Sequence, residues 1–171
     1  MTGNYDGERG RPNLALDDSS FTEEMLTWSF VESRMHAAQN YWIVSASAAG
    51  RPHAVPVWGA WLDDVFYFVG AGRKIRNLRA NPQAVVHLES ADEVVIIEGS
   101  FEEIKRRDES FLQRLDDEFV RKYQTYRPSE NLDNAAGSNN VPVGLFAVFP
   151  QTVIAWSGFA RDATRWRIPH R

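Results

Sequence analysis

The stretch GRPHAVPVWGAWLDD, residues 50–64, has the apolar and β-branched residues of a β-strand but contains two prolines. Proline has no backbone N–H, so a strand that includes Pro52 and Pro56 must leave part of one edge unpaired. One interpretation is an ordinary edge strand. The other is an edge left open for a ligand, and the residues on either side bear on the choice.

Short strand patterns separated by turns surround this stretch. Strands are predicted at residues 41–48, 50–58, 65–69, 83–90, 93–104, 144–156 and 163–168. Helices are predicted at 21–38, where Ser20 and Glu23 resemble a capping box, at a short segment that ends before Pro82, and at 111–123. Many short strands with few helices predict a mainly β fold, a split, Greek-key antiparallel barrel with flanking helices.

The 171 residues are enough for one domain with a substantial core. Residues 1–20 are expected to form a flexible polar leader and 21–171 a single domain. Residues 105–141 are expected to be an insertion of one helix and a long loop, 127–142, made of turn-forming residues. No apolar run approaches the roughly 18 residues that a membrane span needs, so no membrane contact is expected. The absence of cysteine is compatible with the cytoplasm, which is the expected location.

Composition excludes several kinds of chemistry. The chain has no cysteine, which excludes disulfides, thiolate nucleophiles and cysteine-based metal sites. Its net charge of −4 argues against a general nucleic-acid-binding protein. The four histidines show no metal-ligand spacing, and no catalytic motif is present, so no metal site and no catalytic side chain are assigned. If the protein is an enzyme, a bound cofactor is expected to carry the chemistry.

The segment GAGRKIRNLR, residues 70–79, places four cations within seven residues of an acidic chain. Glycines lead into the start of a helix, where free N–H groups and the helix dipole favour an anion. Arg73 and Lys74 would bind a phosphate there. The alternative is a solvated basic helix face. Cations at a helix N-terminus are unfavourable unless something negative lies beside them, which favours the phosphate.

The segment ATRWRI, residues 163–168, alternates as a strand does. Thr164, Trp166 and Ile168 share one face, and Arg165 and Arg167 share the other. Two neighbouring arginines on one face require water, carboxylates or a polyanionic ligand. Solvent is the simpler interpretation for one of them.

Together these segments resemble the pyridoxamine-5′-phosphate-oxidase-like split-barrel family, the flavin/deazaflavin oxidoreductases. The resemblance rests on GRPHAVPVW (50–58), VFYF with GRKIRNLRANP (65–82), VVIIEGSFE (94–102) and, with a gap, IAWSGFARDATRWRI (154–168). It implies a homodimer that binds FMN or coenzyme F420, and less often haem, at the subunit interface.

The resemblance also implies residue roles. The residues that would line the isoalloxazine or deazaflavin ring are His53, Val55, Pro56, Val57 and Trp58. Those that would lie beside or bind its phosphate are Tyr67, Phe68, Arg73 and Lys74. The positions that would reach across from the second subunit are Trp156 and Arg165.

Three positions depart from the family pattern: Gly72 stands where a serine is usual, Phe68 where the oxidase proper has threonine, and Val94 where it has glutamine. These departures argue against a true pyridoxamine-phosphate oxidase and leave FMN and F420 both open. The preferred prediction is hydride transfer between the cofactor and a small organic substrate. The alternatives are a protein that only carries or sequesters flavin, F420 or haem, and a barrel that serves protein interaction alone.

Overall fold

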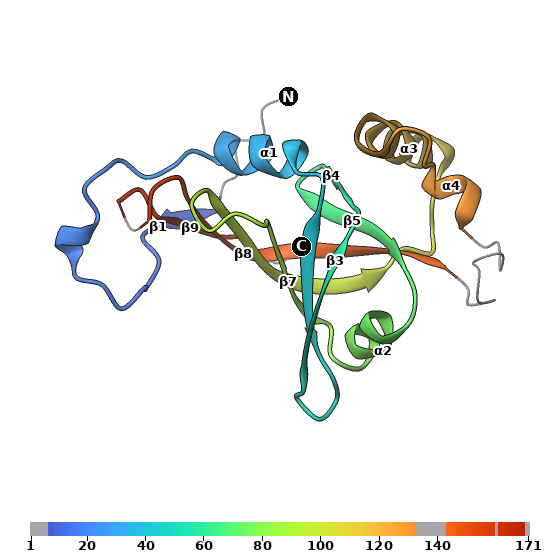
Figure 1. Cartoon of the computed structure of the whole chain (residues 1–171), viewed down its shortest axis with the longest axis horizontal. Helices are drawn as coiled ribbons and strands as arrows, with labels where there is room; N and C mark the ends of the chain where they lie inside the picture. Colours follow the sequence, from blue (N-terminus) through green and yellow to red (C-terminus); the bar gives the residue numbers. More distant parts are fainter. Residues whose placement is uncertain (1–6, 133–142, 160, 170–171) are drawn as a thin grey trace.

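The computed structural model describes residues 7–132, 143–159 and 161–169. They form a nine-stranded sheet with short helices at its margins (Figure 1). The strands are β1 (Glu8–Gly10), β2 (Tyr41–Ala46), β3 (Pro52–Val57), β4 (Ala60–Leu62), β5 (Val65–Gly70), β6 (Gln83–His87), β7 (Val94–Glu103), β8 (Gly144–Trp156) and β9 (Thr164–Arg167). The helices are α1 (Trp28–Ala37), α2 (Arg73–Ala80), α3 (Glu109–Tyr123) and α4 (Pro128–Asn131), with a 3₁₀ turn at Asp18–Ser20. The seven predicted strands are all present, and β1 and β4 are additional.

Strand β8 organises the sheet. One of its edges pairs with β7 along its length. The other pairs with β5 through residues 144–148 and with β9 through residues 152–155. Pro150 is tolerated within β8 because the register with β7 shifts there, between Glu98 and Gly99. Because the partner of β8 changes halfway along it, the antiparallel sheet divides around the core, which confirms the predicted mainly β split barrel.

The core lies within this curved sheet. Its largest fully buried side chains include Tyr41, Phe66, Phe68, Phe146 and Trp166. The strand alternation places them inside, since successive side chains point to opposite faces. In ATRWRI, Thr164 and Trp166 are buried while Arg167 is exposed, as predicted. A second, smaller apolar cluster lies between β4, β5 and α3.

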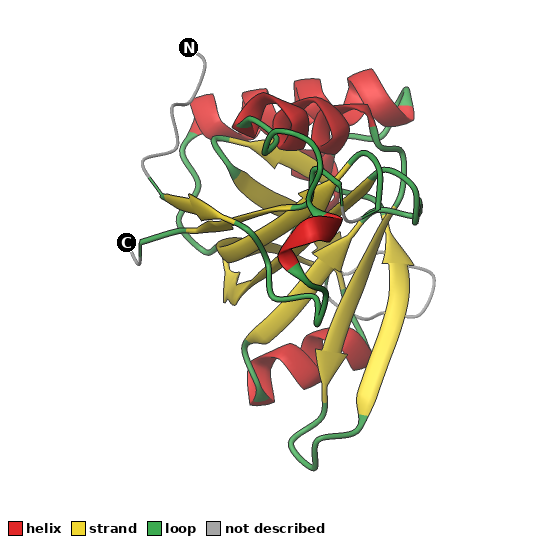
Figure 2. Ribbon diagram, turned by 90° about the vertical axis from the view of Figure 1, so that its left-hand side faces the viewer, coloured by secondary structure: helices red, strands yellow, loops and turns green. Residues whose placement is uncertain are grey.

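The helices cover the two ends of the sheet. Helices α1 and α3 lie at one end, and α2 lies at the other beside the protruding β2–β3 hairpin (Figure 2). Among the described residues, no helix has both the length and the apolar character required to cross a bilayer.

The N-terminal part of the chain differs from the prediction. Helix α1 begins at Trp28, with Thr27 as N-cap, rather than near residue 21. The Glu23 N–H bonds to the Arg161 carbonyl, and the Leu26 N–H bonds to the Thr164 hydroxyl at 2.8 Å. Because the C-terminal segment satisfies these donors, residues 21–27 stay extended and the predicted capping box does not form.

The predicted leader and long loop also need correction. Residues 8–10 of the expected leader form β1, which pairs with β9. In the expected loop 127–142, residues 128–131 form helix α4, whose Ser129 N–H donates to the buried Asp116 carboxylate at 3.0 Å. Residues 133–142 lie outside the described part of the chain.

Candidate functional site

Strand β3 is an edge strand, as its prolines predicted. It pairs with β2 from Pro52 to Val57 and lies at the end of the strand order. The Arg51 carbonyl accepts a hydrogen bond from the Ser47 N–H at 2.9 Å. The backbone N–H and C=O groups of odd-numbered residues in β3 therefore point towards β2, and those of even-numbered residues point towards the open edge. The prolines therefore fall where no donor is required. The open edge offers three carbonyls but one N–H, that of Ala54.

Strand β5 leads directly into α2 through Ala71 and Gly72. Gly72 is the N-cap, with φ of 79°, and it provides no side-chain cap. Arg73 is the first helical residue. The first N–H groups of an α-helix have no partner within the helix, so this turn presents donors and the positive end of the helix dipole.

We expect Gly72→Ala to destabilise the protein by about 1 kcal/mol or more, because the backbone conformation at Gly72, with φ of 79° and ψ of −145°, is one that essentially only glycine adopts. Nothing lies within 4 Å of a Cβ built at Gly72, so the cost is conformational rather than steric. Urea denaturation of the variant and of the wild-type chain measures it. Gly50→Ala is the matched control, since Gly50 also has positive φ and open surroundings but is in the β2–β3 turn rather than at a helix start, and it should be destabilised by a similar amount. Equal stability of Gly72→Ala and the wild type would contradict the assigned conformation.

A pocket of about 520 Å³ opens at this helix start. The residues that line it are Gly70, Ala71, Gly72, Ile75, Arg76, Arg79, Glu103, Val143, Gly144 and Phe146. Arg79 pairs with Glu103 at 3.0 Å. Within the described residues, the exposed guanidinium groups of Arg73 and Arg76 have no ion-pair partner. The pocket therefore combines apolar lining with one cation, Arg76, that has no ion-pair partner among the described residues, while the predicted phosphate residues Arg73 and Lys74 lie at the helix start but are not among the residues that line it.

Lys74 lies across the start of α2 and is half-buried. Its side chain covers Gly70, where a Cβ would come within 2.9 Å of the Lys74 Cε. Its amine is 3.4 Å from the Ala71 carbonyl. Burial lowers the pKa of Lys74. A negatively charged ligand beside the amine would oppose this effect and favour the charged form.

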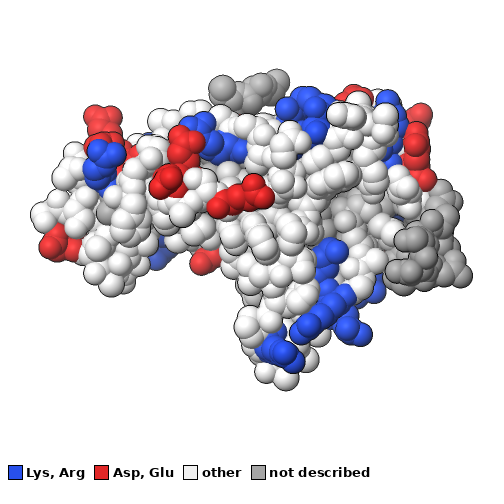
Figure 3. Space-filling view, viewed as in Figure 1, with Lys and Arg blue, Asp and Glu red and all other residues white. Residues whose placement is uncertain are grey.

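Positive charge gathers at this end of an otherwise acidic molecule. Lys and Arg side chains cluster over α2 and the tip of the β2–β3 hairpin, where Arg51 connects the strands (Figure 3). Such a local field attracts anions.

Two polar side chains, Ser45 and Asn77, connect the backbone of β3 to α2. The Asn77 side-chain amide is buried and lies 3.4 Å from the Ser45 hydroxyl. That hydroxyl lies 3.5 Å from the His53 carbonyl. His53 is opposite Ser45 in the β2–β3 register, and its buried Nδ1 has no hydrogen-bond partner. The structure thus connects the backbone of the predicted residue His53 to α2 through Ser45 and Asn77, but His53 is not among the residues that line the α2 pocket.

Other predicted residues lie elsewhere. Phe68 is fully buried and packs against Phe66, Phe101 and Phe146, so its side chain supports the core beneath α2. Tyr67 points to the opposite face of β5 and packs against Phe111 of α3.

The residues of β3 that were predicted to line the ring lie on both faces of the sheet, because side chains alternate along a strand. Val57 is buried in the core, and Val55 is half-buried against it. Pro56 is exposed on the opposite face. Trp58 follows the strand, is 52% exposed, and stacks on Tyr123 of α3 with ring centroids 4.7 Å apart.

Trp156 and Arg165 are not part of the site at α2. Trp156 contacts Phe159 edge-to-face, and its indole lies 3.3 Å from the Ala91 carbonyl. Arg165 lies opposite Ile154 and has a buried Nε without a partner. Both residues are on the outer face of the β8–β9 part of the sheet.

Sequence reasoning missed Ser45 and Asn77 and did not assign Arg76 to the site. Asn77 had one available signal, a polar residue directly before the apolar residue Leu78, which shares a helix face with Ile75. For Ser45 and Arg76 the decisive facts are their neighbours in space, which no local pattern encodes.

Comparisons with known proteins agree with this architecture. The family model of pyridoxamine 5′-phosphate oxidase matches residues 30–157. No curated protein matches the chain. Solved structures with the same fold include the haem storage protein HutZ of Vibrio cholerae, with 14% identity over 73% of this chain and 91% of that one and a TM-score of 0.57.

Two further structures carry other names. A FAD-binding protein of Mesorhizobium loti is 20% identical over 82% of this chain and 95% of that one, with a TM-score of 0.54. An F420 reductase is 19% identical over 71% and 94%, with a TM-score of 0.51. At these identities the structures support the fold alone. The family model spans most of the chain, and the protein therefore belongs to the pyridoxamine 5′-phosphate oxidase family.

Proposed function

We propose that this protein binds FMN or coenzyme F420 and transfers hydride between the cofactor and a small organic substrate. The phosphate of the cofactor would lie at the start of α2, against Arg73 and Lys74 and beside the pocket that Arg76 lines, and the ring system of the cofactor would lie along the open edge of β3. This proposal rests on family membership together with the residues at those two places.

The observation that carries the proposal is the charge at the start of α2. Arg73 and Arg76 have no ion-pair partner among the described residues, the helix N-terminus has no side-chain cap, and Gly72 and Arg76 line an open pocket there. Without an anion these like charges oppose the helix dipole. A phosphate monoester or diester would accept hydrogen bonds from the N–H groups and from the guanidinium.

The open edge of β3 suits a flat heterocycle with hydrogen-bonding atoms at its rim. Six strand residues extend over roughly 20 Å, which is longer than a three-ring system. The Ala54 N–H and its neighbouring carbonyls would hydrogen-bond to the ring's pyrimidine end. Trp58 lies at the far end of this edge, and its exposed face would border the ring or the substrate.

The residues of this chain would bind, orient and shield the cofactor rather than act as acids or bases. When bound, FMN or F420 supplies the hydride acceptor or donor. The cations at α2 would fix the phosphate, and the backbone of β3 would fix the ring, so that the substrate meets the reactive face in one orientation.

A second candidate is a protein that carries the cofactor without turnover. It is favoured by one comparison, the haem storage protein of the same fold. The two candidates differ in one measurement. In an enzyme, bound reduced cofactor is reoxidised when an organic acceptor is added, whereas in a carrier the bound cofactor does not react with any acceptor tested.

We further propose that the chain forms a homodimer through the outer face of its sheet. Half-buried apolar side chains lie there on neighbouring strands, including Trp42, Val44, Val85, Ile96 and Ile154. Burying them against a second copy would remove apolar surface from water. Trp156 and Arg165, on the same face, would then reach the partner's cofactor site. Sedimentation at micromolar concentration should give twice the mass of one chain.

The direct test is a parallel titration of the purified protein with FMN and with F420, followed by cofactor fluorescence. We expect saturable binding of one of them, weakened by added salt because charged groups hold the phosphate. Free riboflavin, which lacks the phosphate, should bind at least tenfold more weakly than FMN if FMN is the cofactor. The proposed function fails if neither FMN nor F420 binds.

A further inference from the structure

The short connection between β3 and β4 is held by the last turn of α3. The Gly59 N–H donates to the Tyr123 hydroxyl at 3.0 Å. The Gly59 carbonyl accepts from the Lys122 amine at 3.2 Å and is also 3.0 Å from the Tyr123 hydroxyl. Both backbone polar groups of Gly59 therefore depend on α3.

Glycine is required at this position by space. A Cβ on residue 59 would lie 2.4 Å from ring atoms of Phe66 and 2.8 Å from the Tyr67 carbonyl oxygen. The preceding residue, Trp58, lies flat on Tyr123, with an interplanar angle of 11°. The end of β3 is thus fixed by the same α3 residues through stacking and through hydrogen bonds.

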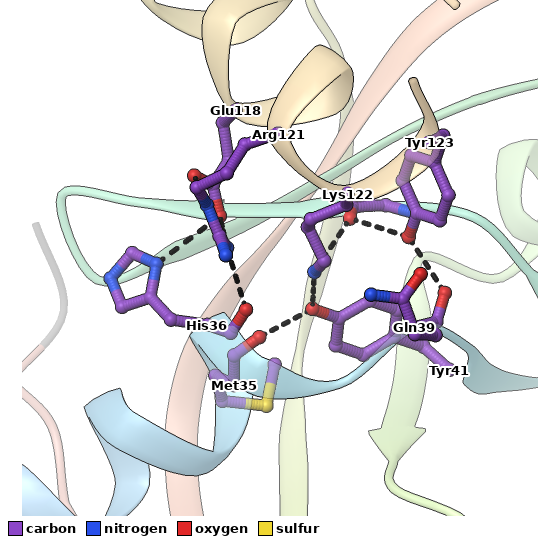
Figure 4. Close-up of polar contacts among 9 residues, drawn as sticks. Met35, His36, Gln39, Tyr41, Glu118, Arg121, Lys122 and Tyr123 are labelled. Carbon is purple, nitrogen blue, oxygen red and sulfur yellow. Dashed lines mark hydrogen bonds and ion pairs between the residues drawn. The ribbon is translucent and has the colours of Figure 1, made fainter.

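Lys122 occupies the centre of this contact and is 6% exposed (Figure 4). Its amine donates to the Tyr41 hydroxyl, which in turn donates to the Met35 carbonyl. The amine also lies 4.4 Å from the centre of the Tyr41 ring. No carboxylate forms an ion pair with it among the described residues.

The choice of lysine at this position is informative. The chain has 16 arginines and three lysines, Lys74, Lys105 and Lys122. Arginine stays charged in proteins, whereas a buried lysine can lose its proton. Of the three lysines, Lys105 is exposed, Lys74 is half-buried and Lys122 is buried. The buried position is therefore occupied by a cation that can become neutral.

We propose that the last turn of α3 is a proton-sensitive latch, in which Lys122 and Tyr123 hold Gly59 and Trp58 in place and protonation of Lys122 weakens the hold. The latch concerns the protein without any ligand. Where the proposed function also holds, the latch positions the end of the strand that borders the cofactor.

The charged groups around Lys122 set the direction of this response. Burial lowers the pKa of Lys122 to about 8, while Glu118 raises it and Arg121 lowers it to a smaller extent. Glu118 is engaged by Arg121 at 2.6 Å and by His36 at 3.3 Å. In the closed state the Lys122 amine contacts Gly59, and in the open state it is exposed to water. Because the pKa of the amine in the closed state is below its ordinary value of 10.5, the charged amine favours the open state.

The pH window follows from these values. Below about pH 8 the amine is charged in both states, and the latch keeps its weakest, constant strength. Between about pH 8 and 10 the closed state loses the proton first, so closure strengthens by roughly tenfold per pH unit. The hydroxyl donors persist across this window, since burial raises the pKa of Tyr123 to about 12 and that of Tyr41 further.

Selective ¹³Cε-lysine labelling tests the proton directly. In a Lys74→Arg, Lys105→Arg variant, Lys122 gives the only lysine signal, and we expect it to titrate near pH 8 and to move towards pH 10.5 in urea. This measurement keeps Lys122 in place, so it does not depend on whether a Lys122 variant folds. An ordinary titration near pH 10.5 in the folded protein would overturn the proposal.

Two further variants test the hold. The unfolding constant of the wild type, relative to Lys122→Met, should fall by at least tenfold from pH 8 to 9.5 and stay level from pH 6.5 to 7.5. Parallel dependence of the two unfolding constants on pH would contradict the latch.

Tyr123→Phe keeps the stacked ring but removes the hydroxyl, so exchange of the Gly59 amide, followed by mass spectrometry at pH 7, should accelerate at least tenfold. Unchanged exchange would likewise contradict the latch.

Discussion

Replacing Arg73 and Lys74 together with alanine should abolish cofactor binding and leave the protein folded. A hydrogen bond to a charged group contributes about 1.5–3 kcal/mol, so losing two corresponds to a drop in affinity of roughly 10²- to 10⁴-fold. Folding should be unaffected, because Arg73 is exposed and unpaired and the Lys74 amine makes one long contact, 3.4 Å to the Ala71 carbonyl. Removing cations from a helix N-terminus also relieves an unfavourable interaction with the dipole.

The chain offers a matched control for this experiment. Lys105 and Arg106 are also adjacent, exposed cations, so Lys105→Ala with Arg106→Ala changes the net charge by the same amount. We expect this control to bind FMN or F420 within about threefold of the wild type, the difference reflecting long-range charge alone. Isothermal titration at fixed ionic strength compares the three proteins, and thermal unfolding verifies their folding. Wild-type affinity in the Arg73, Lys74 variant would refute the phosphate site.

Truncating Phe68 should produce the largest loss of stability among the predicted site residues. Phe68→Ala removes a fully buried ring that contacts three other phenylalanines, and such substitutions cost about 3–5 kcal/mol. That is a large part of the 5–15 kcal/mol that stabilises a typical domain. Equilibrium urea denaturation measures the free energy of unfolding. A cost below about 1 kcal/mol would contradict the assignment of Phe68 to the core.

A milder change separates the core role from a role in binding. Phe68→Leu keeps an apolar side chain and should cost less stability than Phe68→Ala. If Phe68 acts through packing alone, the leucine variant should bind the cofactor with wild-type affinity while it remains folded. A loss of affinity of tenfold or more in a stable leucine variant would instead show that the aromatic ring supports the phosphate pocket directly.

Much of the architecture could be predicted from local patterns. The alternation in ATRWRI and the prolines at 52 and 56 each follow from one backbone property, the two-residue period of a strand and the missing N–H of proline. Both patterns are confirmed by the structure. The start of α1 was predicted wrongly, because Thr164 and Arg161, far away in the sequence, bind the N–H groups that the helix would have used.

The candidate site was predicted in part, and the division has a physical cause. The basic helix start after Gly70 is contiguous in sequence, so its charges and glycines could be recognised together. Arg76 and Arg79 both line the pocket, but Arg79 is paired with Glu103, and this pairing depends on the approach of β7 to α2. A count of cations cannot tell a neutralised arginine from an available one.

By itself, the sequence determined the strands, the unpaired edge and the anion-attracting helix start, since each depends on residues close together in the chain. The tertiary structure alone decided which polar groups are buried away from water. Lys122 lies in an amphipathic helix and resembles any surface cation, yet packing against Tyr41 and Gly59 buries it without a carboxylate. The cost of burying a charge depends on the atoms that surround it, and those atoms come from distant parts of the chain.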